Sequence, residues 1–535
     1  MSLNYASLLK IFVVGFVLLS VGACKPANKG QGALKSEGIA ALNLSKSDSS
    51  VFSKYFSTQP CEVDELEALG ALAGLGLGEN GANDLTFASR NFSDGLVTYR
   101  DMVVQNEDEV SFTVKTAVFH CPQMGDEAPG FARLDLTDAL VRDTEGTTFT
   151  LGTLNIASPT PDAAGAIVDG MVNPTARRQG DIGFKAVSVT DAKIQADALN
   201  GALKALAWGE MRDETGAGKA DLTIENLNLT VPGSTRDQDM TLDFKGMSAR
   251  NLNIGGGLDA QKAMTPDGAI GGVLGNLNAF QKPYDQLIVD ILKIDSDLIS
   301  VDFGGIEGQT EENGDIITTR QSLKPTVISL KPALSQIQQF ERNYGIMKTL
   351  GFETMEISGS SVSTLNSAED SVTVSDGLLV VKDGFSLNFE YSAEGLAEMT
   401  QKLGNLAEAG ETPDPLAAYD SLKLRDLRLT LEDNSIVERG LKLASEMLGQ
   451  SEQNIKRSLG LAVFAAALKA ENDLQAEVYT ETVDAFADFV KKGGSLTIEA
   501  NPPAPFPLAP LLSNQGEEID PDELGFSAIQ EGGGE

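Results

Sequence analysis

The chain has 535 residues, of which 41% are hydrophobic and 22% are charged, and these values are ordinary for a folded protein. Its length suffices for about two to four domains with a large core. The formal net charge of −36 is unusual. Because such a surface repels the phosphates of nucleic acid, we expect no nucleic-acid partner.

The N-terminal segment contains an apolar run, Ile11–Val21, preceded by Lys10. A membrane-spanning helix needs about twenty apolar residues, so this shorter run fits the core of a signal peptide covering residues 1–23. Val21-Gly22-Ala23 before Cys24 resembles the lipobox of bacterial lipoproteins. That resemblance implies cleavage before Cys24 and a lipid on this cysteine. Ordinary signal peptidase would cut the same bond without adding lipid.

The cysteine count helps to choose between these two alternatives. The chain has three cysteines. If Cys24 is lipidated, Cys61 and Cys121 remain as an even pair, and a disulfide between them is expected in an oxidising compartment. Without lipid, one thiol of a secreted protein is left over. We therefore favour a lipid-anchored protein, with a disulfide that closes a loop of about sixty residues and contributes roughly 4 kcal/mol.

Residue Lys25 bears on the destination of the predicted lipoprotein. Lipoproteins of enteric bacteria that stay in the inner membrane carry Asp after the lipidated cysteine, whereas Lys25 follows Cys24 here. The resemblance therefore implies an outer-membrane anchor facing the periplasm of a Gram-negative bacterium. Residues 24–50 are rich in small and polar side chains, which predicts a flexible tether. Folding is expected to begin near Val51, with a short helix within 62–74.

A recurring eight-residue pattern dominates the predicted N-terminal β-rich domain, residues 51–256, and returns further along the chain. Positions one, three, six and eight are mostly apolar, and position five is always Asp or Asn. The copies are 97–104, 134–141, 187–194, 222–229, 247–254, 372–379 and 422–429. The alternation is typical of a strand, but its phase slips between positions three and six. A β-bulge at the Asp or Asn would return both halves to one face.

Several copies continue through a turn into a second strand. The sequence Asp383-Gly384 between two apolar strands is a strong hairpin signal. The copies are irregularly spaced, which argues against a solenoid or propeller of fixed period. We therefore predict an α+β, β-rich fold, in which a long antiparallel meander of bulged strands and hairpins carries inserted helices and a C-terminal helical block.

The expected helices lie between the hairpins. Leu199, Leu203 and Leu206 form a helical stripe ending near Trp208, which we expect to fill the core. Residues 257–350 are predicted to be a mixed helical and strand region, with a strand at 298–303 and a helix through 334–347. The last domain, 351–513, is expected to contain β-hairpins, a helical block and a Pro-rich strip.

The helical block, residues 435–492, should contain three helices. The first ends at Gly449, Ser451 caps the second, which includes the apolar residues 459–468, and the third ends before Gly493. A strand is expected at 495–500. The Pro-rich strip, 501–512, either lies across an apolar surface or presents a docking segment. Residues 514–535 are acidic and Gly-rich and are predicted to be a disordered tail.

Three patterns that resemble functional motifs have a structural interpretation that we prefer. His120 is the single histidine and adjoins Cys121, so neither a multi-histidine metal site nor a His-dependent nucleophile is expected. Residues 76–81, GLGENG, have dinucleotide-loop spacing but follow a helical stretch instead of a strand. Asp520 and Asp522 lack the spacing of a calcium-binding loop. We therefore expect no catalytic residue, no metal and no cofactor.

The eight-residue copies also carry a resemblance to a known group of proteins. Over roughly residues 90–500, strands such as MTLDFKGMSARNLNI (240–254) alternate with short helices, and this texture resembles the AsmA-like and YdgA-like β-repeat proteins of the Gram-negative periplasm. AsmA-like proteins are usually anchored by a helix, whereas a lipid anchor is predicted here. No functional residue is transferred from these families.

These observations favour a non-catalytic, lipid-anchored envelope protein that acts in outer-membrane maintenance or shelters an apolar ligand in a curved sheet. Its partners would be the membrane, through the anchor, and an apolar ligand or an envelope protein. A surface adhesion or display module is the alternative. An envelope hydrolase with paired carboxylates is the third hypothesis, but the chain has 77 acidic residues, so pairs of carboxylates are inevitable.

Overall fold

The structure is a computed structural model. It describes residues 49–57, 61–78, 84–105, 111–125, 128–142, 146–172, 183–212, 218–233, 239–255, 282–337, 340–399, 402, 421–458, 476–507 and 521–532. The predicted signal peptide, Cys24 and residues 25–48 of the tether lie outside these ranges. Contacts divide the chain into an N-terminal unit, Leu44–Ala260 with Gln286–Asp297, and a C-terminal unit that includes Gln261–Asp285 and Leu298–Glu535.

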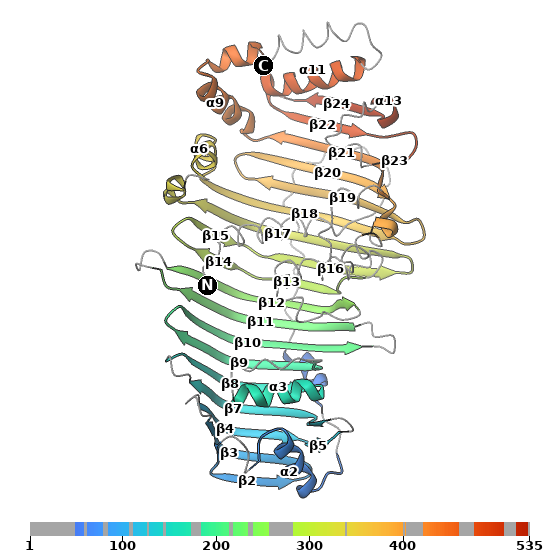
Figure 1. Cartoon of the computed structure of the whole chain (residues 1–535). Helices are drawn as coiled ribbons and strands as arrows, with labels where there is room; N and C mark the ends of the chain where they lie inside the picture. Colours follow the sequence, from blue (N-terminus) through green and yellow to red (C-terminus); the bar gives the residue numbers. More distant parts are fainter. Residues whose placement is uncertain are drawn as a thin grey trace. The chain divides into compact units, whose positions relative to one another are not determined.

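The N-terminal unit is an antiparallel meander, as predicted (Figure 1). From β3 to β12, each long strand pairs with the next one in the order β3-β4-β7-β8-β9-β10-β11-β12. Short strands complete its edges: β1 and β2 pair with β3, and β13 and β14 pair with β12. The strands are β1 (Asp84–Thr86), β2 (Ser89–Ser93), β3 (Leu96–Gln105), β4 (Ser111–His120), β7 (Arg133–Arg142), β8 (Thr148–Ala157), β9 (Ala186–Ala196), β10 (Leu199–Arg212), β11 (Gly218–Val231), β12 (Met240–Gly255), β13 (Gln286–Val289) and β14 (Leu292–Asp295).

Two helices cover one face of this sheet, which we call the inner face. They are α2 (Glu65–Gly74), which begins at the capping residue Asp64, and α3 (Pro161–Val172). Their apolar side chains join those of β3, β4 and β7 in one buried cluster. Val97, Phe119 and Leu134 of the sheet are fully buried there, each 0% exposed. The short strands β5 (Gln123–Met124) and β6 (Pro129–Gly130) pair separately beside α2.

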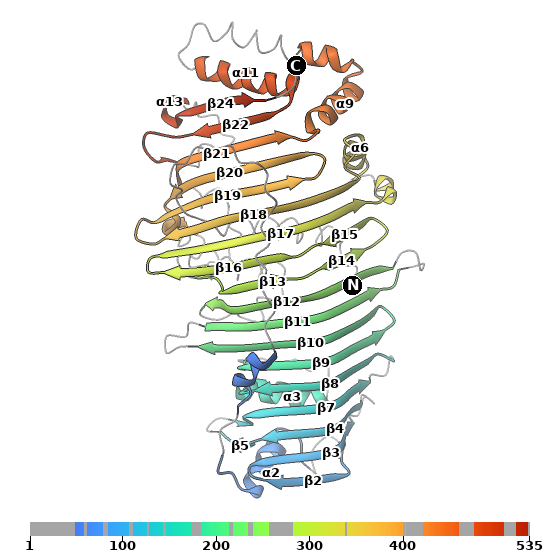
Figure 2. The ribbon, with the colours of Figure 1, turned by 180° about the vertical axis from the view of Figure 1, so that it is seen from behind.

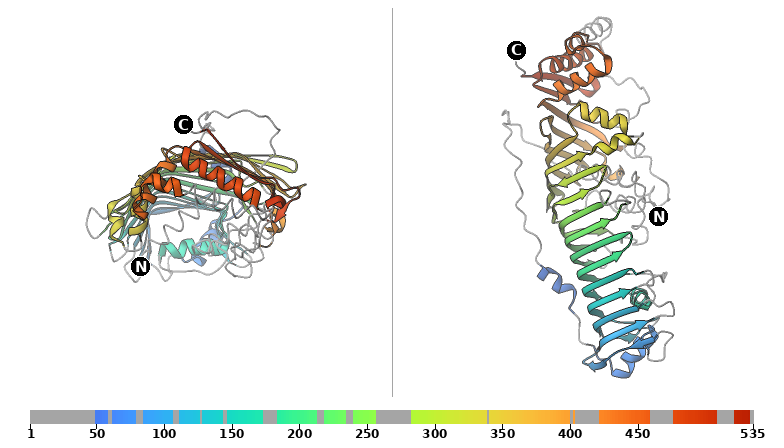
Figure 3. Two further views of the ribbon diagram at one scale, coloured as in Figure 1. Left: turned by 90° about the horizontal axis from the view of Figure 1, so that it is seen from above. Right: turned by 90° about the vertical axis from the view of Figure 1, so that its left-hand side faces the viewer.

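The opposite face of the same sheet, the outer face, carries the short helix η1 (Ser49–Tyr55). Helix α3 lies in front of the strands in Figure 1, whereas η1 lies in front of them in Figure 2, which is turned by 180°. The edge-on view in Figure 3 also places η1 and α3 on opposite sides of these strands. The first described residues are therefore docked on the face that α2 and α3 leave free.

The Asp and Asn of the eight-residue pattern have the backbone geometry that the pattern predicts. Six of the seven are left-handed, with φ between 46° and 53°: Asp101, Asp138, Asp191, Asn226, Asn251 and Asp376. Asp and Asn tolerate this conformation because their short polar side chains bond locally. In β3, Val97 and Tyr99 before Asp101 and Met102 and Val104 after it are all buried in the same cluster. Both halves of the copy thus face inward.

The predicted β-bulge occurs at only some of these positions. The strand register shifts beside Asn251, Asp376 and Asp426. It does not shift at Asp101, Asp138, Asp191 or Asn226. The neighbouring strand interrupts its own inward–outward alternation opposite the same Asp or Asn. In β4, for example, Val114 and Ala117 are both buried, on either side of exposed Lys115. Because both paired strands interrupt their alternation at the same position, the register between them stays constant.

The helix predicted at 199–208 is wrong, because these residues form β10, which is paired on both sides. The phase slip at Lys204 explains the error. It brings Leu199, Leu203 and Leu206 to the inner face of a strand at spacings of four and three residues, which is also the spacing of a helical stripe. Trp208, expected to fill the core, is half-buried on the inner face.

The C-terminal unit is also an antiparallel meander, in which β17 pairs with β15 and β16 and then β18 to β22 and β24 follow in turn. The predicted mixed region, 257–350, is divided between the two units: its strands β13 and β14 belong to the N-terminal unit, whereas β15, β16 and β17 belong to the C-terminal unit, where β17 pairs with β18. The strands are β15 (Ile299–Phe303), β16 (Ile306–Asn313), β17 (Ile316–Leu330), β18 (Thr354–Asn366), β19 (Ser371–Val381), β20 (Phe385–Glu394), β21 (Lys423–Asp433), β22 (Ser495–Ala500), β23 (Phe506–Pro507) and β24 (Phe526–Glu531).

Several helix ends in this unit agree with the sequence prediction. Helix α9 (Ile436–Leu448) stops at left-handed Gly449, the backbone N–H of Asn454 donates to Ser451 Oγ at 3.3 Å, and α11 (Ala476–Lys492) ends before Gly493. Residues 459–468 lie outside the described ranges. The single helix expected through 334–347 is instead η3 (Pro332–Gln336) and α6 (Glu341–Thr349), because Ile337 is extended.

The predicted disordered tail is wrong for residues 521–532. They contain α13 (Pro521–Leu524) and β24, which pairs with β22 from Ser495–Glu531 to Ala500–Phe526. Ala528 packs beside a buried cluster that contains Phe489 and Leu496. The acidic and Gly-rich surroundings hid this short apolar alternation. None of the described helices is long and apolar enough to cross a membrane.

Candidate functional site

The outer face of the N-terminal unit holds the first described residues through a buried carboxylate. Asp221 of β11 is only 3% exposed. Its Oδ2 lies 3.0 Å from Lys54 Nζ and accepts the Tyr55 hydroxyl at 2.9 Å. The ring of Tyr55 fills the space above Gly209 of β10, where a Cβ would lie 2.3 Å from the ring carbon Cδ2. A glycine is therefore required beneath this ring.

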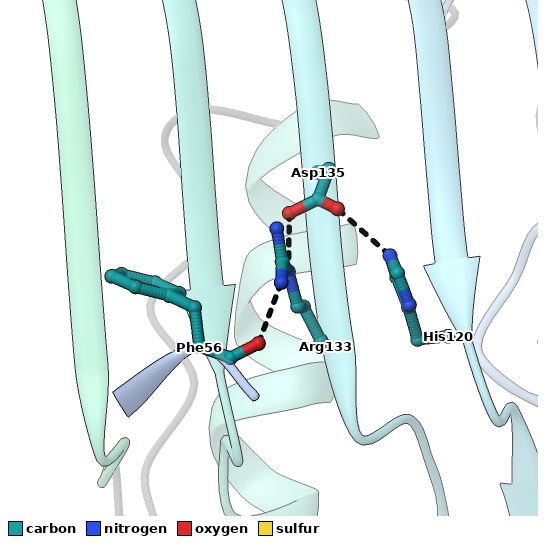
Figure 4. Close-up of polar contacts among 4 residues, drawn as sticks. All are labelled: Phe56, His120, Arg133 and Asp135. Carbon is teal, nitrogen blue, oxygen red and sulfur yellow. Dashed lines mark hydrogen bonds and ion pairs between the residues drawn. The ribbon is translucent and has the colours of Figure 1, made fainter. Parts of the chain in front are cut away.

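A second cluster on the same face attaches Phe56 to Arg133 of β7 (Figure 4). Arg133 donates from one guanidinium nitrogen to the Phe56 carbonyl oxygen at 2.6 Å, and its Nε donates to Asp135 Oδ1 at 2.7 Å. The guanidinium also lies 5.5 Å from the centre of the Phe56 ring. On the other side, His120 Nε2 lies 2.7 Å from Asp135 Oδ2. Asp135 thus orients Arg133 toward the chain that crosses above it.

The third attachment is covalent. Cys61 is joined to Cys121, directly after β4, as the cysteine count predicts. Gly95 permits the close approach, because a Cβ there would lie 2.6 Å from Cys61 Sγ. Together, residues 49–57 and Cys61 form a segment that we call the strap. It is attached to the outer face at β11, at β7 and beyond the end of β4.

Electrostatics follow from these contacts. Burial raises the pKa of Asp135, but the hydrogen bonds with His120 and Arg133 and the charge of Arg133 outweigh burial and lower this pKa below the usual value. Burial and the neighbouring Asp221 carboxylate raise the pKa of the Tyr55 hydroxyl, which therefore stays protonated as a donor at neutral pH. The pKa of Lys54 is raised as well: burial opposes the charged form, and the contacts with Tyr55 and Asp221 overcome it.

The inner face of β9 to β14 is apolar, but it is less buried than that of β3, β4 and β7. The register places Val189, Leu206, Ile224, Met247 and Val289 in one row across five strands. A parallel row contains Leu203, Leu227, Phe244 and Leu292. Every one of these side chains is half-buried, whereas the corresponding residues of β3, β4 and β7 are buried under α2 and α3. This inner apolar face is the second candidate site.

One buried acidic residue in the C-terminal unit stands apart from these sites. Glu307 of β16 is 5% exposed, and its Oε1 is paired with Lys324 of β17. Its Oε2 has no hydrogen-bond partner among the described residues. The described residues contain no cluster of three or more His, Cys, Asp or Glu that would hold a metal ion. A single carboxylate beside a lysine is not a metal site.

The other motifs noted in the sequence lie only partly within the described residues. Of the GLGENG sequence, Gly76 lies in the turn after α2 and Leu77 and Gly78 follow it, whereas residues 79–81 lie outside the described ranges, as does Asp520. Asp522 is in α13. Of the Pro-rich strip, Phe506–Pro507 form β23 against β21, and residues 508–512 are not among those described. The described residues of these motifs take no part in the strap contacts given above.

Neither candidate site was predicted from the sequence. His120 was expected next to the disulfide, but its contact with Asp135 joins neighbouring strands, and no local pattern indicates it. The strap could have been suspected from Gly209 in the interior of a strand, since a glycine there often marks close approach of another segment. The inner apolar face was hidden where the 199–208 strand was interpreted as a helix.

Two comparisons with known proteins bear on the chain. A family model described as "Uncharacterized protein" matches residues 378–531. The matched segment ends at the last residue of β24, so the family model includes the edge strand and the helices packed on it. No curated protein matches the chain.

Proposed function

We propose that this chain is a non-catalytic, lipid-anchored protein of the bacterial cell envelope that binds an apolar ligand on the inner face of its N-terminal unit. The observation that carries the proposal is the set of half-buried apolar rows on β9 to β14. An extended apolar patch that a folded protein leaves partly exposed commonly marks a binding surface. An acyl chain fits such rows, because it needs apolar contact along its length and no hydrogen-bond partners.

The proposed compartment is supported by two features that are independent of the inner face. The lipobox-like residues before Cys24 favour lipidation, and the Cys61–Cys121 disulfide suits an oxidising compartment such as the periplasm. A protein moored in this way and able to hold an acyl chain would contribute to maintenance of the outer membrane. The absence of a catalytic role is proposed because the single histidine lies beside the disulfide and pairs with Asp135.

Ligand binding is tested with neighbouring residues that face opposite sides of one strand. Leu227 lies on the inner face of β11, and Asn228 is exposed on the outer face. The chain is secreted behind an ordinary signal peptide with Cys24→Ala, so that it carries no covalent lipid and needs no detergent. A dansyl-labelled fatty acid is titrated, and bound lipid is extracted after purification. We expect Leu227→Glu to weaken binding at least tenfold and Asn228→Glu to leave it unchanged.

Controls distinguish a loss of ligand binding from a loss of folding. Circular dichroism and mapping of the disulfide establish that each variant is folded, and Leu229→Glu against Thr230→Glu provides a second matched pair nearer the strand end. Absence of fatty-acid binding by the parent chain, or equal binding by the Leu227 and Asn228 variants, would remove the apolar ligand from the proposal.

The anchor is tested separately. Labelled palmitate should enter the wild-type chain in the cell and should not enter the Cys24→Ala variant. Mass spectrometry of the mature protein should show residues 1–23 removed. A wild type that takes up no palmitate would overturn the lipid anchor and leave the ligand-binding proposal untouched.

A further inference from the structure

We infer that the strap fixes the point at which the N-terminal segment joins the body, on the face opposite the inner apolar face, so that an anchor at the N-terminus leaves that face open to ligand. The inference rests on the proposed function only in naming the anchor and the ligand. The docking of residues 49–57 and Cys61 is a property of the fold and is tested by itself.

The attachments of the strap are spread across the sheet. Lys54 and Tyr55 reach Asp221 on β11, Phe56 is held by Arg133 on β7, and Cys61 is bonded to Cys121 beyond β4. A force that pulls on the N-terminus therefore acts first on the contacts of Lys54 and Tyr55 with Asp221, and on the disulfide last. Without the first two attachments, the disulfide alone would define the attachment point.

The first attachment is shaped for the strap instead of being an accidental surface contact. Gly209 leaves the space that the Tyr55 ring occupies, and any side chain there would collide with the ring. Asp221 is nearly fully buried and contacts a positive charge and a hydroxyl from adjacent strap residues. A buried carboxylate without such partners would be strongly unfavourable, so the sheet and the strap depend on each other at this point.

The two faces are separated by the register itself. Trp208 and Leu222 face inward, and their sequence neighbours Gly209 and Asp221 face outward beneath the strap. A segment docked on Gly209 and Asp221 is thus separated from the apolar rows by the thickness of the sheet. Figure 3 shows η1 on this outer side, with α3 on the other.

Hydrogen–deuterium exchange of the full mature protein tests the strap. We expect the amides of residues 53–57 to be protected in the wild type, and Gly209→Leu to accelerate their exchange at least tenfold by displacing the Tyr55 ring. Tyr55→Ala, which leaves the sheet unaltered, should do the same. Lys193→Ala, at an exposed position of neighbouring β9, is the matched control and should change nothing. Fast exchange of 53–57 in the wild type, or no response to either strap variant, would overturn the inference.

A second measurement concerns the open face. Lipid-anchored protein on phosphatidylcholine vesicles should bind the dansyl fatty acid as tightly as the unlipidated chain, after correction for partition of the probe into the vesicles. Weaker binding on vesicles, with a protected strap, would contradict the open face but leave the docking intact. Equal absence of binding in both forms would instead count against the proposed ligand.

Discussion

The Asp221 carboxylate joins the bulge of the repeat to the strap. Its Oδ1 accepts the backbone N–H of Asn251 at 3.0 Å, at the place where Asp221 faces both Arg250 and Asn251 across the register shift. Its Oδ2 contacts Lys54 and Tyr55. One side chain therefore accepts a backbone N–H at the bulge of β12 with one oxygen and holds the strap with the other.

Replacement of Asp221 by Ala should lower the free energy of unfolding of the N-terminal unit by about 3 kcal/mol, because the side chains of Lys54 and Tyr55 and the backbone N–H of Asn251 all lose their acceptor. Tyr55→Phe, which removes one hydroxyl, should cost about 1 kcal/mol. Trp208 is the only tryptophan and lies in this unit, so its fluorescence during urea unfolding reports the change. Equal effects of the two variants would show that Asp221 acts through Tyr55 alone.

The left-handed positions predict an unusual order of substitutions. At Asp191, φ is 50°, and the side chain is exposed. Asp191→Gly should be nearly neutral, because glycine adopts this conformation without strain, whereas Asp191→Val should destabilise by about 2 kcal/mol. Lys193→Val in the regular part of the same strand is the control and should be tolerated. A stable Asp191→Val variant with unchanged unfolding would contradict the left-handed geometry.

The Asp135 cluster predicts a pH dependence. The pKa of Asp135 is lowered in the folded protein. Its contribution to stability is therefore present above the pKa of an unfolded Asp, and it is lost as the pH falls through the lower folded value. Between about pH 6 and about pH 3, the wild type should lose more stability than Asp135→Asn does. Asp101→Asn, at an exposed position of β3, is the control, and parallel curves for wild type and Asp135→Asn would refute the cluster's role.

The buried pair in the C-terminal unit predicts asymmetric effects. Lys324→Met leaves the Glu307 carboxylate buried without its cation and should destabilise the unit by about 2 kcal/mol; the lysine side chain is 40% exposed, so the loss should be smaller than for a fully buried pair. Adding Glu307→Leu to Lys324→Met should restore most of the loss. Amide exchange of β16 and β17 measures both. A double variant no better than Lys324→Met would indicate that packing, not charge, is responsible.

The sequence was sufficient for features that depend on local chemistry. The Asp or Asn in each copy indicated an irregular backbone, and left-handed angles are found at most of these positions. Gly449 and Ser451 marked helix boundaries because capping depends on adjacent residues. The Cys61–Cys121 disulfide was expected once Cys24 had been assigned to lipidation, because two cysteines then remained.

Features that depend on residues far apart in the sequence could not be predicted from local patterns. Leu199, Leu203 and Leu206 have the same spacing in a helix and in a strand that slips phase, and only pairing with β9 and β11 distinguishes the two. The strap joins Lys54 and Tyr55 to Asp221, more than a hundred residues away in sequence, and no local pattern announces that contact. The tail strand formed because β22 and α11 provide a surface for it.

The matched phase slips in the N-terminal unit have an evolutionary consequence. Because both strands of a pair slip at the same line, the pairing between β3 and β11 keeps one constant offset in each pair of strands. A duplicated or deleted hairpin would carry its own two slips and leave every neighbour aligned. Such a sheet can lengthen or shorten through gene rearrangement two strands at a time, whereas strands with unmatched bulges would need compensating changes next to each junction.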